Sequence, residues 1–233
     1  MKDRVSPEVL SKFPDYIRGV VIARGVNNSG ENQKLLRFLR KVEQEATQDK
    51  ALQDIKNHPR IANWRQTYAD FGSNPNKFYS SIESLGRRAR RGDQVPYIST
   101  LVALFNYFSL KHMVPSGGDD LDSVDGNLRL TLADGDEPFT LLNSDVVEYP
   151  TPGEVIYGDN SKVMCRRWNW RQGDQTKITP ATTNVAINVD CLPPVSRDEA
   201  EAITKELADL VKEFCGGQVA YFLLDASQNE VEI

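Results

Sequence analysis

The segment Pro115-Ser116-Gly117-Gly118-Asp119-Asp120-Leu121-Asp122 stands where the spacing of hydrophobic residues along the chain changes. Between positions 31 and 111, apolar residues recur mainly every three or four positions, which is the spacing of amphipathic helices. From position 127 onward, short segments of alternating polarity are typical of β-strands. The two adjacent glycines predict a flexible turn at Ser116-Gly117-Gly118. The sequence therefore predicts an α+β fold, with helices flanking a mixed sheet.

The predicted elements follow one another without a repeat or a low-complexity linker, so residues 1–233 are expected to form one domain. Residues 1–56 are interpreted as a strand–helix extension packed on the remainder. Helices are predicted over 31–47, 50–57, 63–71, 78–91, the segment after Pro96, and the segment that begins with the capping box Ser196–Glu199. Strands are predicted over 16–24, 127–132, 139–142, 154–157, 164–169, 183–189 and 218–224.

The composition is that of an ordinary globular protein, with 39% hydrophobic and 26% charged residues. No apolar run approaches the roughly 20 residues that span a bilayer. The start, Met1 to Val5, lacks the apolar stretch of a secretory signal, so we expect a cytoplasmic protein with no membrane partner. Three separated cysteines and two histidines give neither a disulfide framework nor a zinc site. We expect no metal and no cofactor.

Charge is unevenly distributed along the chain. The net charge of -5 argues against a protein that coats nucleic acid indiscriminately, and we expect no DNA partner. Residues 56–111 contain nine basic and three acidic side chains, a balance of +6. Residues 116–160 contain one basic and eleven acidic side chains, a balance of -10. Such segregation allows one positive face on an acidic protein.

Three groups of motifs, taken in order, follow the pattern of a known family. They are Ser84-Leu85-Gly86-Arg87-Arg88 with Val95-Pro96-Tyr97-Ile98 and Asn106-Tyr107; Pro115 to Asp122 with Gly126; and Pro152-Gly153-Glu154-Val155-Ile156-Tyr157 with Arg166-Arg167-Trp168-Asn169-Trp170-Arg171 and Thr182-Thr183. In order and spacing they resemble the stand-alone bacterial form of the B3/B4 domain, the tRNA-editing domain of the phenylalanyl-tRNA synthetase beta subunit. The resemblance covers residues 57–215 and implies a B3/B4-like fold.

The resemblance also implies that the chain acts on aminoacyl-tRNA. In the synthetase, this domain hydrolyses tyrosine wrongly esterified to the tRNA for phenylalanine. Because the sequence lacks a nucleotide-binding motif, we expect a trans-acting aminoacyl-tRNA deacylase, which is a carboxylic ester hydrolase. The family's histidine after the helix-ending proline is missing at Pro115-Ser116-Gly117, and its glutamate aligns with Asn188. We therefore expect an amino acid other than tyrosine.

The residues predicted to act on the ester are Asn106, Asn188 and Thr183. An activated ester needs only a positioned water and donors for the developing oxyanion, which suits a chain without a Ser-His-Asp or Cys-His set. Asn106 and Tyr107 end a predicted helix, and Tyr107 is assigned to substrate binding. Asn106 alternatively caps a neighbouring loop, and Thr183 alternatively serves only as a strand former.

Four residues of the opening segment are predicted to bind substrate: Gly117, Gly118, Asp119 and Asp120. One of the carboxylates would bind the α-ammonium group of the amino acid. The spacing does not fit a calcium-binding EF-hand loop. A turn stabilised by side-chain to backbone hydrogen bonds is the alternative.

The run 166–171 is predicted to be a strand, with Arg167, Asn169 and Arg171 on one face and Trp168 and Trp170 on the other. Arg167, Trp168, Asn169 and Arg171 are assigned to substrate binding, by phosphate contacts or by stacking on a base. Alternatively, the tryptophans pack in the core and the arginines are solvated charges at the strand edge.

Four arginines at the end of a predicted helix, Arg87, Arg88, Arg90 and Arg91, are assigned to tRNA phosphates. Alternatively, they only complement the helix dipole.

Two other functions stay open. One is a non-catalytic tRNA-binding module of the same type, suggested by the missing histidine and glutamate. The other is a hydrolase of small amino-acid esters that does not use RNA.

Overall fold

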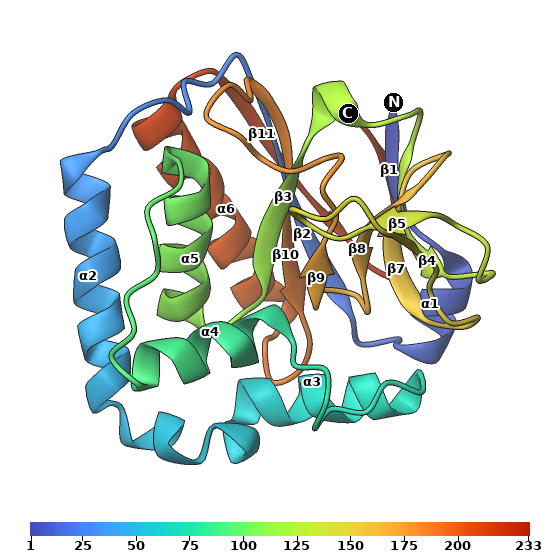
Figure 1. Ribbon diagram of the computed structural model, residues 1–233, viewed down its shortest axis with the longest axis horizontal. Coiled ribbons are helices and arrows are strands. Elements are labelled where there is room, and N and C mark those ends of the chain that lie inside the picture. The colour runs from blue at the N-terminus through green and yellow to red at the C-terminus, as the bar shows by residue number, and fades with distance from the viewer.

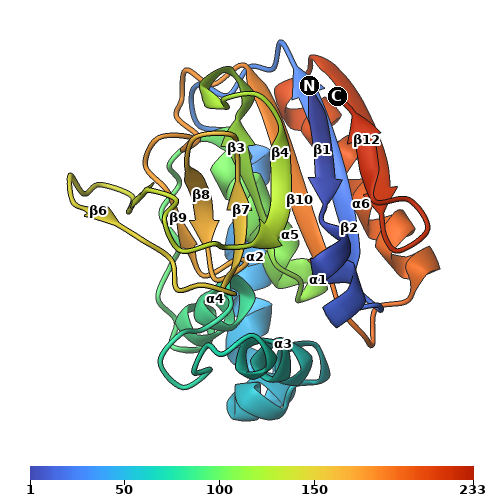
Figure 2. The same cartoon turned by 90° about the vertical axis from the view of Figure 1, so that its right-hand side faces the viewer.

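The computed structural model describes all 233 residues, as two β-sheets with helices covering the outer face of one of them (Figures 1 and 2). The four-stranded sheet has the order β11-β2-β10-β3, with β11 Gln218–Leu224, β2 Ile17–Arg24, β10 Asn184–Cys191 and β3 Ser116–Asp120. The six-stranded sheet has the order β12-β1-β4-β7-β8-β9, with β12 Glu230–Glu232, β1 Lys2–Val5, β4 Leu128–Leu132, β7 Val155–Gly158, β8 Val163–Arg166 and β9 Arg171–Gln172. Strands β5 (Phe139–Thr140) and β6 (Val147–Glu148) form a separate hairpin.

The six-stranded sheet is mixed, as the sequence predicts, because β1 pairs with β4 in parallel while β1 and β12 are antiparallel. The four-stranded sheet is antiparallel throughout. The helices are α1 Pro7–Lys12, α2 Gln33–Gln48, α3 Pro59–Asp70, α4 Ser81–Arg90, α5 Thr100–His112 and α6 Arg197–Cys215, with 3-10 turns at η1 Lys50–Asn57 and η2 Leu121–Ser123. Helices α5 and α6 contact the four-stranded sheet, and α2 packs on α5 (Figure 1). None of the helices is both long enough and apolar enough to cross a membrane.

Serine side chains cap the N-termini of α4, α5 and α6. Ser80, Ser99 and Ser196 each accept a hydrogen bond from the backbone N–H three residues further on, which satisfies one of the free donors of a helix N-terminus. The predicted capping-box position Ser196 is thereby confirmed as the start of α6.

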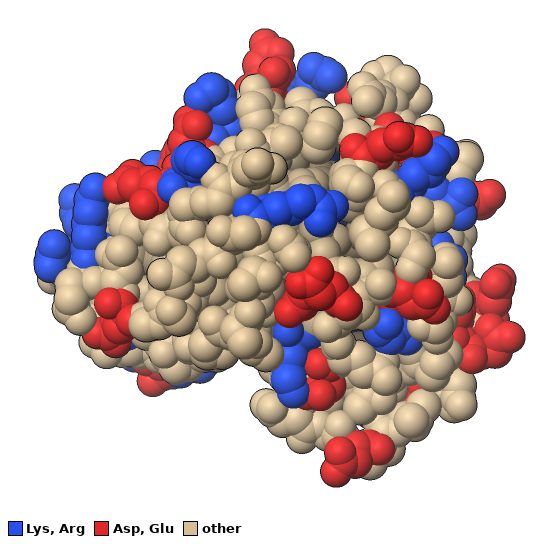
Figure 3. All heavy atoms as spheres, turned by 90° about the horizontal axis from the view of Figure 1, so that it is seen from above, with Lys and Arg blue, Asp and Glu red and all other residues tan.

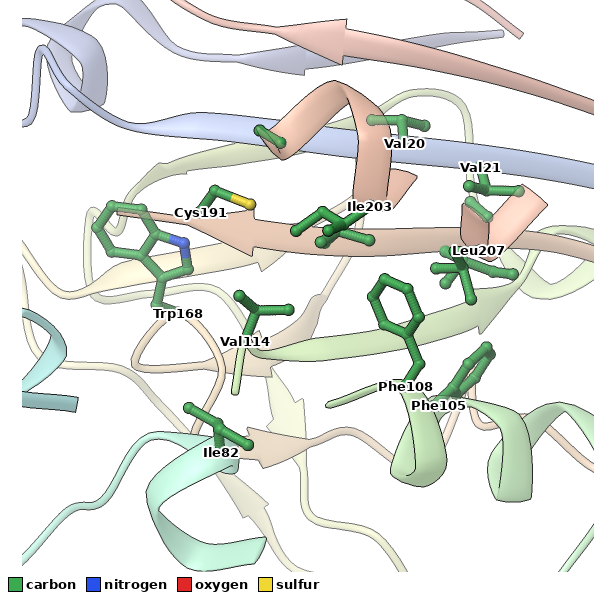
Figure 4. Close-up of a cluster of buried hydrophobic side chains, with 14 of the residues drawn as sticks. Val20, Val21, Ile82, Phe105, Phe108, Val114, Trp168, Cys191, Ile203 and Leu207 are labelled. Atoms are coloured by element: carbon green, nitrogen blue, oxygen red, sulfur yellow. The ribbon is translucent and has the colours of Figure 1, made fainter. Parts of the chain in front are cut away.

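The main hydrophobic core contains 50 buried residues. Part of it lies between the helices and the four-stranded sheet, where Phe105 and Phe108 of α5 meet Ile203 and Leu207 of α6 (Figure 4). The hydrophobic spacing that predicts α5 and α6 thus also defines the faces that bury this sheet.

Two sequence expectations around the sheets are wrong. Ser116-Gly117-Gly118 is not a flexible turn but the start of β3, whose residues pair with β10 in the register Gly117 to Asn188 and Gly118 to Ile187. The predicted strand 164–169 ends at Arg166. Strand β2 lies between β11 and β10, so residues 1–56 contribute a central strand.

Helix α6 approaches β2 closely because Gly19 has no side chain. A Cβ atom at position 19 would lie 2.1 Å from Thr204 Oγ1. Gly19→Ala should therefore lower the free energy of unfolding by about 1–3 kcal/mol through overpacking. Urea denaturation would measure this loss. Adding Thr204→Ala to the Gly19→Ala variant should recover part of the loss, whereas a purely additive double variant would contradict this account.

Candidate functional site

A cavity of about 240 Å³ lies at β3, β10 and the end of β8, next to the start of α4. It is lined by Ser81, Pro115, Ser116, Gly117, Gly118, Tyr157, Cys165, Trp168, Asn169, Trp170, Gln172, Asn188 and Asp190. We call it the inner cavity. Its wall combines amide, hydroxyl and carboxylate groups with aromatic rings, which is the lining expected of a small-molecule site.

A buried carboxylate at the wall, that of Asp190, is held by three donors. Its Oδ1 accepts hydrogen bonds from the hydroxyls of Tyr16 (2.6 Å) and Tyr157 (2.5 Å), and its Oδ2 accepts one from Asn169 Nδ2 (3.1 Å). Burial raises the pKa of Asp190 above its ordinary value, although these hydrogen bonds oppose the rise. No basic side chain is among the lining residues, so the inner cavity favours a cationic ligand group.

Gly117 leaves open space at the same wall. No atom lies within 4 Å of the position that its Cβ would take, and its φ is not in the left-handed region. Its strand partner is Asn188, and residues directly opposite in a sheet share a face. The missing side chain of Gly117 therefore gives the cavity part of its volume.

The open edge of β3 supplies backbone donors. Asp190 N donates to Pro115 O, which sets the phase of the β3–β10 ladder. In an antiparallel ladder the residues alternate, so the N–H groups of Ser116 and Gly118 point away from β10. Asp120 N, which continues this series, donates to Thr176 O on that side. The side-chain Oγ of Ser116 is buried and has no hydrogen-bond partner.

The segment 167–170 is a turn, which corrects the predicted alternation of its side chains. Arg167 and Trp168 have φ angles of 46° and 66°, in the left-handed region that non-glycine residues rarely adopt. Trp168 is fully buried and its ring packs against Phe13, Tyr16 and Trp64. Its indole nitrogen has no hydrogen-bond partner. The two tryptophans therefore do not share one strand face.

Arg167 belongs to the structure that supports the cavity. Its guanidinium carbon lies 3.8 Å from the ring centre of Phe78 and 4.9 Å from that of Trp170. Glu154 binds it at 3.4 Å and also pairs with Arg166 at 3.0 Å. With a buried carboxylate and two rings around it, Arg167 is held away from the position expected for a phosphate-binding residue.

A second, wider hollow of about 610 Å³ adjoins the inner cavity and shares Ser81, Ser116 and Trp170 with it. We call it the outer cleft. Its lining includes four basic side chains and no acidic one: Lys77, Arg88, Arg91 and Arg171. Asn106 also lines the outer cleft. A ligand that enters both hollows would pass the three shared residues.

The other predicted site residues lie outside both hollows. Arg87 binds the buried carboxylate of Glu83 at 2.7 Å, and Arg90 donates to Gln53 O. The side chain of Thr183 is exposed, before the start of β10. Tyr107 packs against Phe38 beside α2. On the face seen in Figure 3, acidic and basic side chains are interspersed rather than gathered by sign.

The acidic pair Asp119 and Asp120 forms hydrogen bonds within the protein. Asp119 Oδ1 accepts from Gln172 Nε2 and Thr176 Oγ1, both at 2.6 Å, and Asp120 Oδ2 accepts from Thr182 Oγ1 at 2.7 Å. Neither residue lines the inner cavity, although Gln172 does. Asp119 therefore does not line the cavity itself, but it holds the side chain of the lining residue Gln172 by a hydrogen bond.

Several residues that build the cavity are absent from the sequence prediction: Asp3, Tyr16, Arg18, Tyr157 and Asp190. A signal existed for Arg18, because it precedes the apolar run Val20 to Ala23 inside a predicted strand, and a buried arginine requires a partner. None of these residues lies in an arrangement of three metal-binding side chains. Burial raises the pKa of Cys165 well above its ordinary value, so this thiol stays protonated and is a poor nucleophile.

A two-sheet α+β domain, with an acidic inner cavity opening on a basic outer cleft, fits a ligand with a small cationic end and a longer anionic part. The family model of the B3/4 domain matches residues 63–216. The match covers more than half of the chain, which belongs to the B3/4 domain family. This confirms the resemblance found from the motifs.

Among solved structures, the chain is similar to an N-terminal fragment of the phenylalanyl-tRNA synthetase beta subunit from Pyrococcus horikoshii. The sequence identity is 12% and the TM-score is 0.46. The likeness covers 93% of this chain and 49% of that chain, so this chain spans about half of the fragment's length. At this score the likeness supports no argument about function. No curated protein matches the chain.

Asp119 should make stability depend on pH. Burial raises its pKa to about 6, against 3.8 for a free aspartate. Between these two pH values the unfolded chain releases the proton of Asp119, whereas the folded chain keeps it. The contribution of Asp119 to the free energy of unfolding therefore falls as pH rises. Asp119→Asn removes this penalty. The unfolding free energy of the variant minus that of the wild type should increase by up to about 3 kcal/mol from pH 4 to pH 7.

Urea denaturation of both proteins at the two pH values would measure this difference. The comparison cancels the titration of the other buried acids. A difference that stays constant or falls with pH would show that Asp119 is ionised in the folded protein already at pH 4.

Proposed function

We propose that this chain is a trans-acting aminoacyl-tRNA deacylase, which hydrolyses the ester of a mischarged tRNA. The observation that carries the proposal is the junction between the acidic inner cavity and the basic outer cleft. An aminoacyl-tRNA has a cationic α-ammonium group next to its ester and phosphates immediately beyond it. Family membership supports the same assignment.

The aminoacyl group would occupy the inner cavity and the terminal nucleotides the outer cleft. Asp190 provides the negative charge for the α-ammonium group, in place of the predicted Asp119 or Asp120. The ester would then lie near the shared residues Ser81, Ser116 and Trp170. Trp170 offers a partly exposed ring on which a base can stack. Lys77, Arg88, Arg91 and Arg171 provide positive charge for the phosphates.

Hydrolysis in this site needs a water molecule as the nucleophile. Water adds to the ester carbonyl, and the bond from that carbon to the ribose oxygen then breaks. The ribose oxygen takes up the proton that the attacking water loses and becomes a hydroxyl, and the products are the free amino acid and the tRNA. One of the two outward N–H groups of β3, that of Ser116 or that of Gly118, would donate to the developing oxyanion. Asn106, at the outer cleft, can hold the water or the ribose.

The experiment that tests the function is incubation of the purified protein with a panel of aminoacyl-tRNAs, both correctly charged and mischarged. Release of the amino acid above the spontaneous rate from one or a few members supports the deacylase. tRNA binding without release from any member would instead indicate the non-catalytic binding module. Hydrolysis of small amino-acid esters without binding of tRNA would indicate the ester hydrolase.

Filling the inner cavity should abolish hydrolysis without unfolding the protein. In Gly117→Val, the new side chain enters open space and suits a strand, so folding should be retained. We expect kcat/KM on the best substrate of the panel to fall about 100-fold or more, because the aminoacyl group is displaced from its position.

Ala220→Val is the matched control for this variant. Ala220 is exposed on β11 at the opposite edge of the same sheet, so the control also adds a valine to a strand. Wild-type hydrolysis by a correctly folded Gly117→Val protein would exclude the inner cavity as the site.

Arginines of the outer cleft should contribute to tRNA affinity and its dependence on salt. Arg88→Gln with Arg91→Gln should weaken tRNA binding and reduce the slope of log K against log salt by about 1–2. Arg90→Gln removes the same kind of charge outside the cleft and should have the smaller effect. Filter binding at several salt concentrations would measure the affinity for tRNA and its salt dependence in both variants. If each removed charge had the same effect inside and outside the cleft, the outer cleft would not be the tRNA-binding surface.

A further inference from the structure

The inner cavity contains an amide whose orientation is determined by its neighbours. Arg18 of β2 is fully buried and pairs with the equally buried Asp3 of β1, through Nη1 to Oδ1 at 2.7 Å and Nη2 to Oδ2 at 2.9 Å. Its guanidinium carbon also lies 4.6 Å from the ring centre of Tyr157. The position and direction of the guanidinium donors are therefore fixed by the two sheets.

Two further donors of Arg18 point at Asn188. Its Nε donates to Asn188 Oδ1 at 3.1 Å, and its Nη2 donates to the same oxygen. A guanidinium group has donors only, so a flipped amide would set an NH₂ group against N–H groups. The chemistry of Arg18 thus selects one of the two amide orientations, which the shape of the amide alone would leave undecided.

In this orientation Asn188 presents its Nδ2 to the cavity. Asn188 is one of the lining residues, and Nδ2 forms no hydrogen bond within the chain. It is also not one of the buried polar atoms that lack a partner, so it reaches solvent. The open space left by Gly117 lies across the ladder from it. The cavity therefore contains a fixed hydrogen-bond donor that awaits an acceptor.

The charge of the surroundings limits what this acceptor can be. Asp190 lies two residues from Asn188 on the same face of β10, and Asp119 is buried on the neighbouring strand. The positive charge of Arg18 is already paired with Asp3. A carboxylate on the ligand would thus meet uncompensated negative charge, whereas a neutral oxygen would not. A phenol hydroxyl, a stronger donor than acceptor, matches this donor less well.

We propose that Asn188 determines specificity by selecting aminoacyl groups whose side chain has an uncharged oxygen acceptor, as in aliphatic hydroxyl and carboxamide side chains. The inference rests on the proposed deacylase function and names the substrate class of that site. Arg18 and Asp3 act through Asn188 as positioning residues. A side chain without an acceptor leaves the amide donor unpaired in a buried site, which costs binding.

The test uses two amino acids of equal length that differ in one atom. O-Methylserine has an ether oxygen where norvaline has a methylene group, and neither has a side-chain donor. With tRNA charged with each, wild-type kcat/KM should be about tenfold or more higher for O-methylserine. In Asn188→Asp the new carboxylate keeps the contact to Arg18 but presents an acceptor to the cavity, so the preference should disappear.

A binding measurement separates this inference from the proposed reaction. Adenosine carrying each amino acid through a 3′-amide bond is not hydrolysed as an ester, and calorimetry on the folded wild type reports the same preference. A binding preference without turnover of any ester would support the inference and overturn the deacylase. Equal rates and equal affinities for the two amino acids, with the wild type, would overturn the inference. Thermal unfolding checks that Asn188→Asp is folded.

Discussion

The buried ion pair between Asp3 and Arg18 joins the two sheets and is the constraint on which the cavity depends. Each side chain is fully buried, so neither charge is stable without the other. Arg18 lies on β2, an inner strand of the four-stranded sheet, and Asp3 lies on β1, an inner strand of the six-stranded sheet. The pair therefore fixes the distance between the sheets at the place where a layer of polar groups replaces apolar packing. The sheets do not close completely over this layer, and the space left is the inner cavity.

A polar layer of this kind is a costly way to hold two sheets together. Replacing a buried ion pair with well-packed apolar residues is often neutral or stabilising. The carboxylate of Asp190, held by two tyrosines and an asparagine, adds a further buried charge. Protein sites commonly retain such groups where binding needs a preset arrangement of charges and donors. The outer cleft needs no such construction, because its basic side chains are solvated.

The sequence predicted the helices around the site and the position of Asn188 in a strand, since both depend on local spacing. The partners of Asn188 could not be predicted, because Asp3 and Arg18 meet it only through the pairing of distant strands. The alternation rule failed at Arg167 and Trp168, which adopt left-handed backbone angles for which their residue types give no signal. Two glycines suggested a turn at 116–118, where ladder pairing with β10 instead makes an edge strand. Of the four arginines assigned together, packing divides Arg88 and Arg91 from Arg87 and Arg90.

The family match begins at residue 63, whereas two of the residues that orient the cavity amide, Asp3 and Arg18, precede it. The recognisable region, residues 63–216, contains neither β2 nor β11 and therefore supplies only β10 and β3 of the four-stranded sheet. A gene fragment cut at the family boundary would encode a pocket without its anchor. In a fusion with another enzyme, this domain would have to be transferred together with the first strands of the chain. The unit that can move between proteins is thus larger than the unit that sequence comparison detects.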